Sequence, residues 1–181
     1  MPTGSELCTA ENAHITSLNQ QLTDYAGTTA QLPLAIVSTN PTLDSTAVAR
    51  LKHAGMLLLR VSAEALSKSL EDEHIVDAVD WAVLEGHVSS LTLVGHSQSA
   101  SIPLDAISQP ANPVELARMH NERVEASKLK LKDDLARFLS HPKIHAHLDE
   151  GRLSLHALLF LQESSTFLRF DAQNDGFRPL I

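Results

Sequence analysis

Residues 90–100 read Ser90-Leu91-Thr92-Leu93-Val94-Gly95-His96-Ser97-Gln98-Ser99-Ala100, and this stretch decides the fold of the chain. An apolar run of this length followed by polar residues predicts a buried strand over residues 90–95 that ends in a loop. Loops at the carboxyl ends of strands are where open α/β sheets place their binding sites. We therefore expect a functional site around His96.

The segments before this strand alternate between strand and helix patterns. Apolar runs at residues 34–37 and 56–61 predict two more buried strands. A helix from Asp44 or Ser45 to His53 lies between them, and a longer amphipathic helix over about residues 71–87 precedes the third strand. This alternation predicts a mostly parallel sheet flanked by helices.

The pattern changes after the third strand. A proline-rich loop around Pro103, Pro110 and Pro113 leads into a long charged helix over about residues 114–139. A short helix then begins at Pro142 and is closed by Gly151. The last predicted elements are strands at residues 153–162 and 166–171, joined by a turn at residues 163–165, and a final strand near residues 177–180.

We expect one α/β domain over residues 31–181, with a central, mostly parallel sheet of about four to five strands flanked by helices. A helix over residues 5–25 would form an N-terminal helical arm within residues 1–30. A chain of 181 residues that is 43% hydrophobic can bury one good core and is short for two.

Charge and hydropathy exclude several classes of protein. The net charge of −8, from 14 Lys and Arg against 22 Asp and Glu, disfavours nucleic acid as a partner. No apolar run reaches the roughly 18 residues of a membrane span, and the first residues lack the pattern of a signal peptide. We expect a soluble, cytoplasmic protein. Cys8, the only cysteine, excludes a disulfide framework.

The loop after the third strand resembles the G-x-S-x-G nucleophile elbow of α/β-hydrolases, which would make Ser97 a nucleophile. Asp105 or Asp149 and then His156 would complete a triad in the order this fold requires. The match is incomplete because Ser99 replaces the second glycine of the motif and no HGGG-like oxyanion segment lies upstream.

Several segments, taken in order, are similar to the β-class carbonic anhydrases. In that family one strand ends in Cys-x-Asp-x-Arg, and a later helix leads to a strand that ends in Gly-His-x-x-Cys. The corresponding helix and strand here are His74-Ile75-Val76-Asp77-Ala78-Val79-Asp80-Trp81-Ala82-Val83 and Leu91-Thr92-Leu93-Val94-Gly95-His96. The later helix, glycine turn and strand of the family resemble His141-Pro142 and Leu148-Asp149-Glu150-Gly151-Arg152-Leu153-Ser154-Leu155-His156.

This resemblance covers roughly residues 30–181 and implies a β-carbonic-anhydrase-like fold. Enzymes of this family hold a tetrahedral zinc with two thiolates and one imidazole, and the zinc lowers the pKa of a bound water to about 7. The resemblance places Ser38, His96 and Ser99 at the three ligand positions, and Asn40 and Thr42 at those of the family's Asp-Arg pair. A serine hydroxyl is a poor zinc ligand because it does not ionise near neutral pH. We therefore expect no zinc and no carbonate dehydratase activity.

Other arrangements of polar residues leave alternatives open. His141, His145 and His147, with Asp149 beside them, have spacing that would suit a metal on a helix, although Pro142 puts His141 in a cap position. The candidate polar cluster at the former zinc site is Ser38, Asn40, Thr42, Asp44, His96, Ser97 and Ser99. It would hold a water, an anion or a small metabolite, or it would contain a Ser-His-Asp relay built from Ser38 or Ser99, His96 and Asp44.

Two functions follow from these observations. The first is a zinc-free structural, regulatory or small-anion-binding subunit, with an active paralogue or a small metabolite as a further partner. The alternative is a metal-free enzyme of hydrolase or lyase type that uses the remodelled Ser/His/Asp pocket. In both cases the family resemblance implies a homodimer or a higher even oligomer in which the N-terminal arm wraps the partner.

Overall fold

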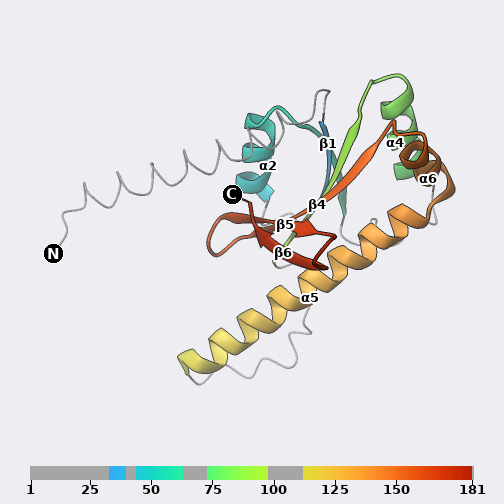
Figure 1. Cartoon of the computed structure of the whole chain (residues 1–181). Coiled ribbons are helices and arrows are strands. Elements are labelled where there is room, and N and C mark those ends of the chain that lie inside the picture. Colours follow the sequence, from blue (N-terminus) through green and yellow to red (C-terminus); the bar gives the residue numbers. More distant parts are fainter. Residues whose placement is uncertain (1–32, 40–43, 63–72, 98–111, 181) are drawn as a thin grey trace.

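The computed structural model describes residues 33–39, 44–62, 73–97 and 112–180, with the side chains at 38, 39, 44, 45 and 62 excepted (Figure 1). Its elements are β1 (Pro33–Thr39), α2 (Asp44–His53), β2 (Leu57–Ser62), α4 (His74–Leu84), β3 (Ser90–His96), α5 (Pro113–Ser140), α6 (Pro142–Asp149), β4 (Ser154–Leu161), β5 (Thr166–Asp171) and β6 (Gly176–Pro179).

One sheet runs through the described part of the chain, in the strand order β2-β1-β3-β4-β5-β6. The first four strands in this order are parallel, whereas β5 and β6 are antiparallel additions at one side. In the register, Val37 of β1 lies beside Val94 of β3, and His96 of β3 lies beside Phe160 of β4. The carboxyl ends of β1 and β3 therefore meet at the same edge of the sheet.

Helices cover both faces of the sheet (Figure 1). On one face α2 buries Val48 and Leu51 against a core that includes Val94, Phe160 and Phe167. On the other face α4, α5 and α6 pack around a larger core. Its helical contributions include Val79, Phe138 and Ile144. The apolar runs of β1 and β3 are buried on both sides, which explains why they lack an alternating pattern.

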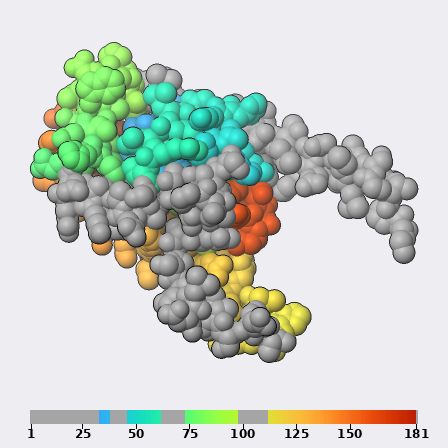
Figure 2. All heavy atoms as spheres, turned by 180° about the vertical axis from the view of Figure 1, so that it is seen from behind, coloured from blue at the N-terminus to red at the C-terminus, as the bar shows by residue number. Residues whose placement is uncertain are grey.

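Helix α5 packs on the sheet with only part of its length. It has 28 residues, so it is about 42 Å long at the usual helical rise. Its buried residues are all carboxyl-terminal to Ala126: they are Ser127, Leu131, Asp134, Leu135 and Phe138. The amino-terminal half, drawn in yellow, extends beyond the sheet in both views (Figure 1, Figure 2).

The structure confirms the α/β fold and the order of its elements. The sheet has six strands in the described residues, where we predicted about four to five, because β5 and β6 both continue it. Helix α4 is shorter than the predicted range of residues 71–87. It stops at Leu84 because the amides of Gly86 and Val88 bond back to the carbonyls of Trp81 and Ala82. A Cβ at Gly86 would lie 2.8 Å from the Ala82 carbonyl oxygen, so this stop requires glycine.

The predicted N-terminal arm, residues 1–30, lies outside the described residues, as does the loop with Pro103 and Pro110. Within the described ranges, the helices do not include one long and apolar enough to cross a membrane.

Candidate functional site

The candidate site lies at the carboxyl edge of the sheet, where β1 and β3 end side by side. Ser38 is the penultimate residue of β1, and His96 is the last residue of β3. His96 is 5% exposed, so the imidazole lies inside the protein rather than on its surface. The two strands are adjacent and parallel, which brings these two positions to one edge as predicted.

Ser97 follows His96 directly and is completely buried. Its backbone amide donates to the carbonyl of Phe160 at 2.9 Å. Its hydroxyl donates to Oε2 of Glu163 at 2.9 Å and accepts a hydrogen bond from the amide of Gln162 at 3.2 Å. The hydroxyl therefore both donates and accepts within the protein, and it joins the end of β3 to the turn between β4 and β5.

Two other elements hold the same turn. His120 of α5 places Nδ1 3.4 Å from Oε1 of Glu163. Arg50 of α2 is buried and donates from Nη1 to the carbonyl oxygen of Ser165. Burial lowers the pKa of Arg50 from its ordinary value, yet the guanidinium stays charged at neutral pH. The β4–β5 turn is thus held by three side chains: Arg50 of α2, Ser97 just after β3, and His120 of α5.

Glu163 and His120 were not among the residues singled out from the sequence. Residues 97, 120 and 163 are far apart in the chain, and a turn glutamate and a histidine on a charged helix give no local signal. The only available clue is topological: a parallel β3–β4 pair brings the residue after β3 to the residues that end β4.

Three comparisons place this architecture among known proteins. No protein-family model matches the chain. Carbonic anhydrase 1 of Escherichia coli O157:H7 is 28% identical over 123 residues, which is 57% of this chain and 56% of that protein. The chain thus spans little more than half the length of this curated relative.

Solved structures of β-carbonic anhydrases share the fold over most of the chain. A tetrameric enzyme from Sordaria macrospora is similar with a TM-score of 0.57 and 16% identity, over 93% of this chain and 96% of that one. The Coccomyxa enzyme in complex with acetazolamide is similar with a TM-score of 0.55 and 12% identity, over 92% and 86%. The chain has the fold of the β-carbonic anhydrases.

The donor set that the resemblance implies does not fit the zinc of this fold. On that resemblance, Ser38, His96 and Ser99 would stand at the family's three ligand positions, and the whole chain has one cysteine. One imidazole and two neutral hydroxyls lack the soft, anionic sulfurs that zinc selects. Among the described residues, no three His, Cys, Asp or Glu side chains come together to hold a metal ion.

Part of the predicted polar cluster lies outside the described residues. Asn40, Thr42 and Ser99 are in undescribed ranges, and the side chains of Ser38 and Asp44 are not described. Cys8 and Asp105 also lie outside the described residues. The described members of the cluster are His96 and Ser97.

The hydrolase triad is not assembled in this β-carbonic anhydrase-like protein. The register pairs His156 with Thr92, four residues before His96, so His156 lies roughly 13 Å along the sheet from the end of β3. Asp149 pairs instead with His145 on α6. Since Ser97 is buried and bonded to a glutamate, it is not an exposed nucleophile.

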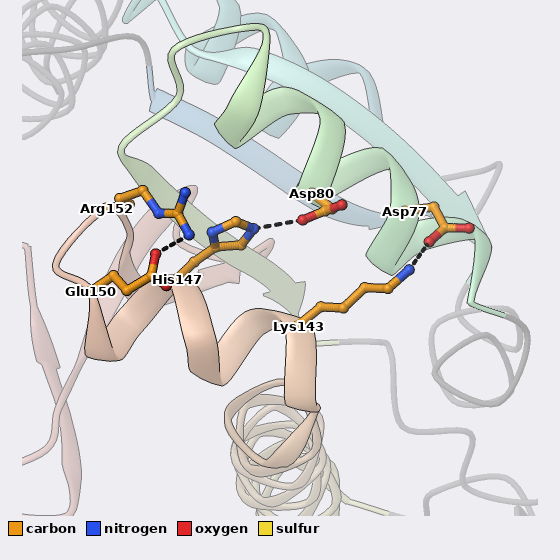
Figure 3. A network of polar contacts seen from close by, with 6 residues as sticks. All are labelled: Asp77, Asp80, Lys143, His147, Glu150 and Arg152. Carbon is orange, nitrogen blue, oxygen red and sulfur yellow. Dashed lines mark hydrogen bonds and ion pairs between the residues drawn. The ribbon is translucent and has the colours of Figure 1, made fainter.

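Among the described residues, the histidines of α6 do not form a common metal site. Figure 3 shows His147 turned toward Asp80 of α4, and Lys143 turned toward Asp77. Nε2 of His147 contacts Oδ1 of Asp80 on α4 at 2.7 Å, and His147 is almost fully buried. His145 faces outward and pairs with Asp149 at 2.8 Å. Next to His147, Lys143 donates to Asp77 of α4 at 2.5 Å. The contacts of His147 with Asp80 and of Lys143 with Asp77 hold α6 against α4.

Proposed function

We propose that this chain is a zinc-free β-carbonic-anhydrase-like subunit with a structural, regulatory or small-anion-binding role. The observation that carries the proposal is the presence of one cysteine in the whole chain, Cys8. No single chain can then supply the two thiolates of the family's zinc site, whatever the alignment around Ser38. Carbon dioxide hydration by a zinc-bound hydroxide is therefore not its activity.

Restoring the ligands tests this proposal directly. Protein purified without a histidine tag should contain well under one zinc per chain when its metal content is measured by mass spectrometry. The double variant Ser38→Cys/Ser99→Cys, which keeps His96, should bind about one zinc per chain because it has the two-thiolate, one-imidazole donor set. Adding His96→Ala to that variant should weaken zinc binding strongly.

Two results would contradict the proposal. Stoichiometric zinc in the unmodified protein would show that another donor set replaces the thiolates. Carbon dioxide hydration above the buffer blank that disappears in His96→Ala would show that the original activity survives. The double cysteine variant also tests the alignment, since thiolates at the wrong positions would gain no zinc that depends on His96.

A metal-free enzyme at the same edge is the alternative function. The Ser97 hydroxyl is buried and already donates one hydrogen bond and accepts another. Ser97 is therefore disfavoured as the nucleophile of such an enzyme. A relay through Ser38 or Ser99, His96 and Asp44 stays a prediction because three of these side chains lie outside the described set. Hydrolysis of an activated ester that is lost in both Ser38→Ala and His96→Ala would support this alternative.

We further propose that the protein assembles as an even oligomer. The Sordaria macrospora relatives are tetrameric. In this chain, residues 113–126 of α5 include no buried residue, while Val114 and Leu116 are 78% and 53% exposed. A helix of this length is marginal in water without tertiary contacts, so a partner subunit that covers it would stabilise it. The cytoplasmic location, and an N-terminal arm that wraps the partner subunit, stay predictions.

A further inference from the structure

A small pocket lies on the β5–β6 hairpin, away from the candidate site. It has a volume of about 230 Å³ and is lined by Arg169, Asp171, Arg178, Pro179 and Leu180. Because β5 runs antiparallel to β4, Asp171 at its end lies toward the amino edge of the parallel strands. The former zinc positions are at the opposite, carboxyl edge.

Two arginines face each other across this pocket. Arg169 of β5 and Arg178 of β6 are direct partners in the antiparallel register, so their side chains leave the same face of the sheet. This is the face that also carries Phe167 and Leu180, on the side of α2. Like charges directly opposite one another destabilise a sheet unless something neutralises them.

Asp171 neutralises only one of the two guanidinium groups. Oδ2 of Asp171 lies 3.1 Å from Nε of Arg178 and accepts from the side-chain amide of Asn174 at 2.7 Å. Oδ1 accepts from the backbone amide of Gln173 at 3.0 Å. These contacts, led by Asn174, hold the pKa of Asp171 below its ordinary value.

Arg169 is left as an uncompensated positive charge. Its guanidinium makes no hydrogen bond or ion pair with the side chain of another described residue, and His156 lies nearby on β4. Burial first, and then the charge of Arg169, lower the pKa of His156, so the imidazole favours its neutral form and does not alter the charge near Arg169. In a chain of net charge −8, this pocket carries a surplus of positive charge.

We propose that this pocket binds a small oxyanion of the phosphate or carboxylate class, held between Arg169 and Arg178. Guanidinium groups bind such oxygens with paired hydrogen bonds. The pocket is smaller than the roughly 300–1,000 Å³ of sites for drug-sized ligands, so its volume suits an ion of a few atoms. Asp171 positions Arg178 and discriminates against large polyanions by its own charge.

The proposal is tested by titrating the full-length protein with inorganic phosphate in a calorimeter, with the ionic strength held constant by sodium chloride. We expect saturable binding of one phosphate per chain. Arg169→Gln should weaken it about tenfold or more, because a charge-assisted hydrogen bond is lost. The matched control is Lys132→Gln, which removes the same charge from a residue that contacts Phe170 and Asp175 of the same hairpin. The affinity of this control should be unchanged.

Several results would overturn the proposal. They are the absence of saturable binding, binding that Arg169→Gln leaves intact, and equal weakening by Lys132→Gln. Arginines on an edge strand also prevent sheets from pairing with one another. Self-association of Arg178→Gln, together with no phosphate binding by the unmodified protein, would assign Arg178, on the edge strand β6, to that protective role instead. Thermal unfolding in phosphate-free buffer verifies that each variant folds.

Discussion

Two histidines on α6 make the same kind of contact in different surroundings. His145 pairs with Asp149 at 2.8 Å, and the two side chains are 60% and 68% exposed. His147 pairs with Asp80 at 2.7 Å, and its side chain is only 5% exposed. Exposed pairs contribute little, whereas a buried polar group that loses its partner costs its full desolvation energy. The contribution of each histidine to stability therefore depends on its burial.

We expect His147→Ala to lower the free energy of unfolding by about 2–3 kcal/mol, because it removes buried contacts and leaves Asp80 without its partner. His145→Ala, the matched control on the same helix, should cost less than about 0.5 kcal/mol. Urea unfolding followed by circular dichroism measures both. Similar losses for the two variants would mean that His147 does not fasten α6 to α4.

His156 gives stability a dependence on pH. Burial and the charge of Arg169 lower its pKa in the folded chain, so the unfolded chain binds the proton more readily. The contribution of neutral His156 to stability is complete above a pH of about 6.5, which is the pKa of a histidine in the unfolded chain. It is lost as the pH falls below that pKa. We expect His156→Gln to reduce the fall of the unfolding free energy as the pH drops below about 6.5. Parallel curves for variant and parent would contradict this.

Helix α5 consists of two segments, of which one packs on the sheet and the other does not. Its carboxyl-terminal segment buries Phe138 completely and Leu131 almost completely, and it contacts β3, β4 and α6. Lys130 supports this segment through an ion pair of 2.8 Å with the buried Asp134. Its amino-terminal segment begins at a cap in which Oδ1 of Asn112 accepts from the amide of Glu115 at 2.9 Å. The stability of the fold should therefore respond only to the first of these segments.

We expect Phe138→Ala to destabilise the chain by about 3–5 kcal/mol, because it leaves a cavity in the main core. Leu116→Ala, in the amino-terminal segment and at a residue 53% exposed, should change the free energy of unfolding by less than about 0.5 kcal/mol. Chemical unfolding at a protein concentration low enough to disfavour association provides the comparison. A large loss for Leu116→Ala under these conditions would show that the amino-terminal segment also stabilises the single chain.

For individual helices and strands, the sequence predicted most of the secondary structure. The apolar runs of β1, β2 and β3, and the prolines at the starts of α5 and α6, mark their elements locally. The end of α4 was misplaced because a helical pattern continues past Leu84, while the stop depends on the backbone bonds of Gly86 and Val88. The tie from Ser97 to Glu163 and His120 could not be predicted, since it joins three distant segments through tertiary packing.

The whole molecule has the fold of the β-carbonic anhydrases with a single cysteine in the chain. The parallel strands, the buried His96 and the pinned β4–β5 turn depend on apolar packing and on Ser97, Glu163 and Arg50. None of these contacts requires a metal ion to form. Under the proposed function, a zinc-free chain can therefore retain the fold, and contacts between subunits are the constraint on its surface that is left to test.

The oligomeric state of the protein tests whether contacts between subunits constrain its surface. The amino-terminal half of α5, drawn in yellow, extends away from the other coloured parts of the chain (Figure 2). Its side chains Val114 and Leu116 are exposed. We expect the protein to be an even oligomer by light scattering coupled to gel filtration, and Leu116→Glu to dissociate it, because a buried carboxylate in an apolar interface is costly. Leu84→Glu, a change of the same chemistry at a residue 47% exposed on α4, is the control and should leave the oligomer intact. A monomer in the unmodified protein, or an oligomer insensitive to Leu116→Glu, would show that α5 is not the interface.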